Sequence, residues 1–205
     1  MHFESLKLVS DSKWQDIEGF DIFPKGSWRT LYKRPIDKRT GDLQWRIIHG
    51  IITTNRHKAH IDPTVKDECP FCFESEDVHH LFLQCERLKP MFLLLEEWSK
   101  DLNYEFTLKG FIYGPKYKYQ NRKRDVLINF LYGQAKLAVW LTRKVKLNRG
   151  VSTDVNMTLR GLISARLTVE FAYYKMVGDL DTFNLTWALN DVLCNLEDGI
   201  LQMNV

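Results

Sequence analysis

The stretch Cys69-Pro70-Phe71-Cys72, followed by His79-His80 and then Cys85, decides how the first half of this chain folds. Its spacing, C-x2-C-x7-H-x4-C, places three thiols and one imidazole within a short loop and one helical turn. This donor set is typical of a structural zinc site, in which four protein ligands leave no open position for a catalytic water. We therefore predict a structural Zn²⁺ as the cofactor, bound by Cys69, Cys72, His80 and Cys85.

Two alternatives stay open at this stretch. His79 competes with His80 as the ligand, in the spacing C-x6-H-x5-C, and we favour His80. In a helix, His80 and Cys85 reach one metal only if the last turn is loose or the helix ends near Cys85. Reduced thiols or a redox pair are disfavoured, because a thioredoxin-type pair needs a strand before it, whereas residues 62–68 are polar and turn-like.

The composition is that of a folded protein in a reducing compartment. The chain has 205 residues, of which 44% are hydrophobic and 13% aromatic, and this is enough to bury a core. With three cysteines on the metal, only Cys194 is left, so a disulfide framework is excluded. The N-terminus lacks the features of a signal peptide, and no apolar run reaches the roughly 18 residues of a membrane span. We expect an intracellular protein, nuclear or cytoplasmic, without a membrane partner.

Apolar residues recur at helical spacing along most of the chain, which predicts a mostly α fold. In the first half we expect helices from near Thr40, over Asn55–His60, and from Arg87 to Asp101. Gly114-Pro115 is a strong helix breaker. It divides the predicted zinc-binding domain (1–114) from a basic helical domain (115–205). We expect the small zinc-stapled N-terminal half to pack on a three-helix C-terminal half or to be followed by it.

Three helices are predicted in the second half. The first spans 121–148, and the second starts at Thr153 or Asp154 and ends at Val177, with Gly178 as its C-cap. The third opens at Asp181 or Thr182, and its apolar positions continue to Leu196.

Basic residues are concentrated around the first of these helices. Between Gln120 and Gly150 there are eight basic residues and one acidic residue, and Lys116-Tyr117-Lys118-Tyr119 leads into them. A second basic cluster, Arg29, Lys33, Arg34, Lys38, Arg39, Arg46, Arg56 and Lys58, flanks the zinc site. Cations neutralise phosphates and tyrosine rings stack on unpaired bases, so we predict a nucleic-acid surface rather than a merely solvated helix face. The predicted contacts are Arg46, Arg56, Lys58, Lys116, Lys118, Arg122, Lys123, Arg124, Lys136, Arg143, Lys144, Lys146 and Arg149.

Catalytic signatures are missing from the sequence. It has no glycine-rich phosphate loop, no Gly-x-Ser-x-Gly elbow and no paired aspartates of a polymerase. A nuclease built from Glu170, Asp179 and Asp181 near Lys175 is the weaker alternative. We therefore predict a non-catalytic chain.

Several motifs between Trp28 and Trp98 follow one family pattern. Trp28-Arg29-Thr30-Leu31-Tyr32 with Pro35 opens it, and Trp45-Arg46-Ile47-Ile48-His49-Gly50 corresponds to its Trp-Arg-Leu-Leu-His-Gly core. Ile52-Thr53-Thr54-Asn55-Arg56 stands where the family has Leu-Pro-Thr-Arg-Asp. Cys69-Pro70-Phe71-Cys72 and residues 77–85 match Cys-Pro-x-Cys and Glu-His-Leu-Phe-x-x-Cys. In these motifs, over about a third of its length, the chain resembles the zinc-binding domain that follows reverse transcriptase in non-LTR (LINE-type) retrotransposon polyproteins.

This resemblance implies a role beside a polymerase, holding template RNA or target DNA during target-primed reverse transcription, and it favours His80 as the ligand. The polymerase and endonuclease themselves are missing, so the chain is expected to be a C-terminal piece of a polyprotein or a host-domesticated tail. We predict a zinc-containing module that binds RNA or DNA largely independently of sequence. The alternative is a protein–protein interaction scaffold or homodimer, in which acidic residues pair with the basic helix: Asp179, Asp181, Asp191, Glu197 and Asp198.

Overall fold

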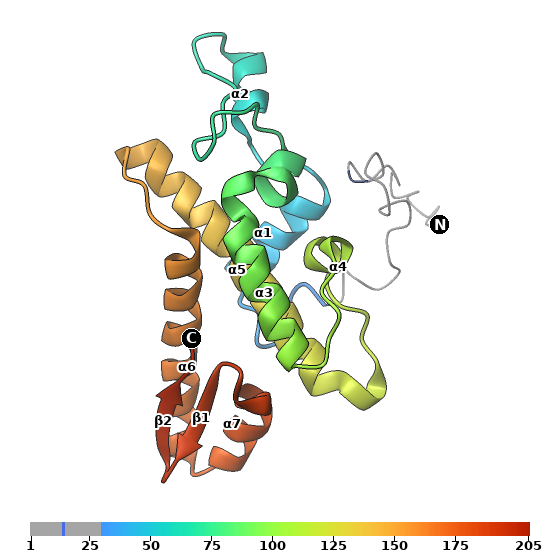
Figure 1. Cartoon of the computed structure of the whole chain (residues 1–205), viewed down its shortest axis with the longest axis vertical. Coiled ribbons are helices and arrows are strands. Elements are labelled where there is room, and N and C mark those ends of the chain that lie inside the picture. Colours follow the sequence, from blue (N-terminus) through green and yellow to red (C-terminus); the bar gives the residue numbers. More distant parts are fainter. Residues whose placement is uncertain (1–13, 15–29) are drawn as a thin grey trace, which may run out of the picture.

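The longest helix, α5 (Arg122–Arg149), runs through the middle of the protein (Figure 1). The structure is a computed structural model that describes residue 14 and residues 30–205. Four other helices pack against α5: α1 (Lys38–Ile48), α3 (Lys89–Asp101), α6 (Val155–Val177) and α7 (Leu180–Trp187). Residues 127–139 of α5 are therefore buried on every side, which explains why this segment is apolar almost all round rather than on one face.

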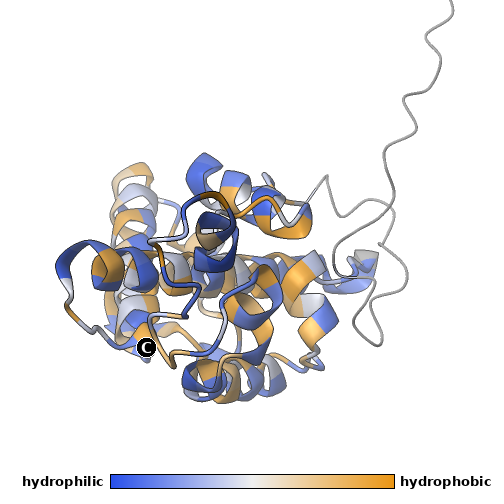
Figure 2. Ribbon diagram, turned by 90° about the horizontal axis from the view of Figure 1, so that it is seen from above, coloured by the Kyte–Doolittle hydropathy of each residue, from blue (hydrophilic) through white to orange (hydrophobic). Residues whose placement is uncertain are grey.

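The prediction of a mostly α protein is confirmed, and short polar side chains set the helix starts. Asp37 accepts a hydrogen bond from the Thr40 backbone N–H at 2.9 Å and caps α1. Asp154 accepts one from the Met157 N–H at 2.8 Å and caps α6. Each bond satisfies an N–H that the first helical turn leaves without a partner. Figure 2 shows helices on which hydrophobic and hydrophilic residues alternate, as expected where one face is buried.

Short helices and loops make up the rest of the first half. The basic helix α2 (Asn55–Ile61) lies at one end of the molecule (Figure 1). A π-helix, η2 (His80–Gln84), and a 3₁₀ turn, η3 (Glu86–Leu88), lead into α3. Helix α4 (Leu108–Tyr113) and the 3₁₀ turn η4 (Tyr119–Asn121) connect α3 to α5.

The end of the chain differs from the prediction. Helix α7 stops at Trp187, and a 3₁₀ turn, η5 (Leu189–Asp191), precedes a hairpin of β1 (Cys194–Glu197) and β2 (Ile200–Met203). Cys194 pairs with Met203 and Glu197 with Ile200. Asp198 and Gly199 both have positive φ, 50° and 73°, as a tight two-residue hairpin turn requires. The last helix does not reach Leu196, because Asn190 and Asp191 have positive φ, 52° and 55°, at which an α-helix does not continue.

Buried contacts cross the predicted boundary at Gly114. One hydrophobic core joins residues such as Leu43 and Phe82 of the first half to Leu131 and Leu159 of the second. Trp14 belongs to this core and donates from its indole N–H to the Ile47 carbonyl at 3.0 Å. The division into two domains stays a prediction. Among the described residues, no helix is both long enough and apolar enough to cross a membrane.

Candidate metal centre and basic surface

The four predicted metal ligands come together at one point. The sulfurs of Cys69, Cys72 and Cys85 and a ring nitrogen of His80 all lie within 4.8 Å of one another. Cys69 Sγ is 3.9 Å from Cys85 Sγ, and Cys72 Sγ is 3.1 Å from His80 Nε2. Tetrahedral zinc with Zn–S bonds of ~2.3 Å needs sulfurs about 3.8 Å apart. The cluster can hold one metal ion, and its donor set fits zinc.

Two local features of the backbone aim these ligands at one point. A tight turn joins Cys69 to Cys72, in which the Phe73 N–H donates to the Cys69 carbonyl at 2.9 Å. On the other side, the wide turn of η2 closes with the Cys85 N–H donating to the His80 carbonyl at 2.9 Å. A π-helix spans more residues per turn than an α-helix. This wide turn, which ends at Cys85, is how ligands five residues apart reach the same site.

The two neighbouring histidines have different surroundings. His80 is buried, and its Nδ1 lies 3.4 Å from the Glu74 carboxylate, which leaves Nε2 facing Cys72. A carboxylate on one imidazole nitrogen orients the ring and fixes which nitrogen is free to bind a metal. The ring of His79 instead packs against Trp14, with centroids 4.8 Å apart. His80, and not His79, therefore belongs to the cluster.

The thiols of the cluster are electrostatically coupled. A hydrogen bond from Cys85 lowers the pKa of the Cys69 thiol to about 5. The same bond and burial raise the pKa of Cys85, because a second thiolate next to the first is unfavourable without a nearby cation. Burial also raises the pKa of Cys72. A divalent cation bound here would stabilise all three thiolates, since metal binding releases thiol protons.

A buried ion pair connects this metal loop to α5 and corrects one prediction. Glu76, four residues before His80, is fully buried and receives two hydrogen bonds from Arg143, one of them from Nε at 2.9 Å. Arg143 also donates to Asn55 Oδ1 at 3.1 Å, at the start of α2. Only 2% of Arg143 is exposed. Arg143 was predicted to contact nucleic acid, but its guanidinium is already occupied inside the core.

Lys136 is the second basic residue whose predicted role is wrong. It is fully buried in the middle of α5, and its Nζ donates to Gln44 Oε1 at 2.8 Å and to the Ile112 carbonyl at 3.3 Å. Burial lowers the pKa of Lys136 to about 7. A side chain enclosed in this way cannot reach a phosphate on the surface.

Two grooves along α5 are lined by several basic residues each, one at the second half of the helix and one at its start. The first is a groove of about 460 Å³ between α1 and α5. Its lining includes four basic residues, Lys38, Arg39, Arg46 and Lys144, and the indole of Trp140. Its acidic lining residue, Asp42, accepts a hydrogen bond from the Tyr32 hydroxyl at 2.8 Å. We call it the α1–α5 groove.

The second groove, of about 530 Å³, lies at the start of α5. Its basic lining residues are Lys109, Lys116, Lys118 and Arg124, and its acidic one is Glu105. Tyr104 adds aromatic surface, whereas Tyr113 is buried, and the Arg124 guanidinium lies 5.5 Å from the centre of the Tyr104 ring. Arg124 is also held by Asp125 and by the Asn103 carbonyl. We call it the α4–α5 groove.

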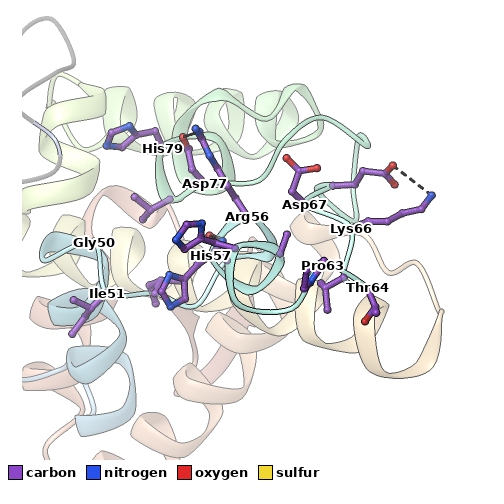
Figure 3. Close-up of a pocket in the computed structure, with 17 residues that line it drawn as sticks. Gly50, Ile51, Arg56, His57, Pro63, Thr64, Lys66, Asp67, Asp77 and His79 are labelled. Carbon is purple, nitrogen blue, oxygen red and sulfur yellow. Dashed lines mark hydrogen bonds and ion pairs between the residues drawn. The ribbon is translucent and has the colours of Figure 1, made fainter.

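The remaining predicted contacts are spread over the surface. Arg122, Lys123, Arg149 and Lys58 are exposed. Lys146 is half-buried and donates to Ser152 Oγ at 2.7 Å. Arg56 pairs with Asp77 at 3.4 Å beside an open cavity of about 990 Å³ next to α2, where His57 and His79 also lie (Figure 3).

The sequence did not predict the acidic partners of His80 and Arg143, which are Glu74 and Glu76. Glu74 and Glu76 carried no local signal, because their contacts depend on the folded loop and on α5. Nothing in the local sequence indicates that the Trp140 indole lines a groove with basic residues. Lys144 and the basic residues of α1 line one groove only because α1 packs against α5, and these two helices lie far apart in sequence.

Comparison with known proteins finds similarity to a transposon protein. The chain is 29% identical, over 203 residues, to the transposon TX1 uncharacterized 149 kDa protein of Xenopus laevis. The match covers 99% of this chain but only 15% of that protein. No family model matches the chain, and no solved structure matches it. Along nearly its whole length, the chain is therefore similar to a part of a transposon protein.

Proposed function

We propose that this chain is a zinc-stapled, non-catalytic nucleic-acid-binding module from the C-terminal part of a retrotransposon reverse transcriptase polyprotein. The observation that carries the proposal is the match of nearly the whole chain to a transposon protein, combined with a Cys₃His cluster at the predicted spacing. A protein of this kind works on RNA and DNA in the nucleus or cytoplasm. Its binding is largely independent of sequence.

Zinc has a structural role in this proposal. Cys69, Cys72, His80 and Cys85 would hold it and fill its four positions. The ion supplies charge compensation for the three thiolates and ties the loop to the start of η2. Because such sites form only in the folded chain, metal binding adds directly to folding stability. The ion would thereby fix Glu76, and with it the ion pair to Arg143 that connects the loop to α5.

The nucleic-acid surface is assigned to the two grooves. Each combines four cations with a single acid and with at least one aromatic ring, which suits phosphates and unpaired bases. Two α5 residues that line them, Arg124 and Trp140, are 16 residues apart, which is about 24 Å along the helix axis. A strand that occupies both grooves must therefore be longer than a few nucleotides, and 20-mers are suitable probes.

The test is binding of the zinc-loaded chain to fluorescent 20-mers of single-stranded RNA and duplex DNA. The variants Arg46→Ala and Lys144→Ala remove cations from the α1–α5 groove, and Lys116→Ala and Lys118→Ala from the α4–α5 groove. Lys100→Ala, an exposed lysine at the end of α3 and outside both grooves, is the matched control. We expect micromolar binding that the groove variants weaken several-fold and the control leaves unchanged. Absence of binding at low salt contradicts the proposal.

A further inference from the structure

Aromatic rings that remain in contact with water lie on one side of α1. Trp45 is 40% exposed and Tyr32 is 48% exposed. Ile47 and Ile48, the next apolar residues of α1, are by contrast almost completely buried and hold the helix against the core. Aromatic rings carry a large apolar area, and its burial is what usually makes them stabilising. The exposed parts of Trp45 and Tyr32 are therefore available for contact with a ligand.

These rings form a row along the helix. The Tyr32 ring lies directly on Gly41, where an added Cβ would come within 2.6 Å of Tyr32 Cδ1. Trp45 follows Gly41 by four residues, and His49 follows Trp45 by another four. Residues with this spacing are neighbours on a helix surface, and the ring centroids of Trp45 and His49 are 4.5 Å apart. Tyr32, Trp45 and His49 therefore lie side by side along α1, and we call them the aromatic row.

The aromatic row borders the α1–α5 groove. Lys38, Asp42 and Arg46 line this groove and are also spaced four residues apart, so they form a parallel row on α1. Trp45 lies three residues after Asp42, which makes the two side chains neighbours across the rows. The Tyr32 hydroxyl donates a hydrogen bond to Asp42 at 2.8 Å and joins the rows directly. A ligand held by the cations of the groove therefore reaches the rings.

The charge of the groove favours an anionic partner. Four basic residues and one acidic residue line it, which leaves an excess of three positive charges. The acid, Asp42, is already hydrogen-bonded to Tyr32. Surfaces that bind single-stranded nucleic acid combine such a basic groove, which follows the phosphates, with rings on which successive bases stack. In a duplex the bases are stacked inside the helix, and taking one out costs free energy.

We propose that the aromatic row stacks on unpaired bases of a nucleic-acid strand whose phosphates lie in the α1–α5 groove. Trp45 is the main stacking residue, because its indole has the largest ring surface of the row, and His49 packs against it from the next turn. The groove therefore prefers single strands to duplexes. This inference rests on the proposed nucleic-acid role and adds the form of nucleic acid that is bound. Bases of RNA and DNA both have a π-face, so the preference applies to both.

The test compares two fluorescent 20-mers of single-stranded DNA, one of ordinary sequence without self-pairing and one whose sugars carry no bases. Both offer the same phosphates, so the ratio of their affinities measures the contribution of the bases. We expect the zinc-loaded wild type to bind the ordinary strand more tightly. Trp45→Leu should reduce this ratio by about 5- to 150-fold, the range for loss of stacking on one base. Trp45→Phe keeps a ring and should retain most of the ratio.

The controls separate stacking from a general effect on the fold. Tyr173→Leu removes a ring that is 54% exposed on α6, outside both grooves, and should keep the wild-type ratio. A partly unfolded variant binds both strands less, so a loss of stability leaves the ratio unchanged. Trp45→Leu should weaken binding of a single-stranded RNA 20-mer in the same way and leave duplex DNA unaffected. Its salt slope should equal that of the wild type, since stacking neutralises no phosphate.

The outcomes distinguish this inference from the proposed function. Salt-dependent binding with the same affinity ratio in the wild type and in Trp45→Leu overturns the stacking inference alone. Equal losses on the single strand and on duplex DNA also overturn it, because a duplex offers no unpaired base. Absence of binding to any of these probes at low salt contradicts the proposed function, and the inference with it.

Discussion

Replacement of Arg143 by alanine tests the connection between the metal loop and α5. Among the described residues, the substitution leaves the buried Glu76 carboxylate with one donor, the Asn55 N–H at 2.7 Å. Removal of one partner from a buried ion pair typically costs about 3–5 kcal/mol. For a chain of this size, each kcal/mol lowers the melting temperature by roughly 2–4 °C. The expected loss of melting temperature is therefore about 6–20 °C.

The assay is urea unfolding of the zinc-loaded chain, followed by tryptophan fluorescence. Lys144→Ala, at the exposed neighbour, is the matched control and should change the free energy of unfolding by at most about 0.5 kcal/mol. The double variant Arg143→Met/Glu76→Gln should recover much of the loss, because it leaves no unpaired charge in the core. If Arg143→Ala is as stable as Lys144→Ala, the buried ion pair is refuted.

His80→Ala should abolish stoichiometric zinc binding, measured by elemental analysis, whereas His79→Ala should keep one zinc per chain because its ring packs on Trp14; equal zinc content in both would contradict the ligand assignment. Burial lowers the pKa of Lys136 to about 7, so between about pH 7 and 10 the unfolded chain binds more protons than the folded one and stability rises with pH. Lys136→Met removes this term, and the wild type should gain stability relative to the variant between pH 7 and 9.5; parallel urea midpoints would count against a buried lysine. Gly199→Ala should cost about 1 kcal/mol, since Gly199 has φ of 73° in the hairpin turn; an unchanged urea midpoint would exclude this turn.

The metal centre could be predicted because its geometry is local. Cys69, Cys72, His80 and Cys85 lie within seventeen residues, so their types and spacing alone limit the metal they can hold. The choice between His79 and His80 was less certain from spacing. In the structure it depends on the wide turn of η2 and on Glu74, which holds the Nδ1 side of His80.

The buried cations could not be found in this way. Arg143 and Glu76 are 67 residues apart, and Lys136 and Gln44 are 92 residues apart. Nothing in the local sequence distinguishes Arg143 from its exposed neighbour Lys144. Only the packing of α5 inside the other helices decides which basic residue faces the core.

The terminal hairpin did have a local signal. Asp198-Gly199 between Leu196 and Ile200 is a typical two-residue hairpin turn. The predicted helix continues to Leu196, whereas in the structure Asn190 and Asp191 have positive φ, at which an α-helix does not continue. The Asp198-Gly199 signal therefore predicts the structure of the C-terminus better than the helical spacing of apolar residues, because the helix ends at Trp187.

The most direct test of the proposed function is the salt dependence of RNA and DNA binding by the zinc-loaded chain. Log affinity should fall linearly with log salt concentration, and each phosphate contact should contribute about one unit of slope. Lys144→Ala and Lys116→Ala should each reduce the slope by about one, while Lys100→Ala should leave it unchanged. An affinity that does not change with salt, or slopes that the groove variants leave unaltered, would contradict binding through these grooves.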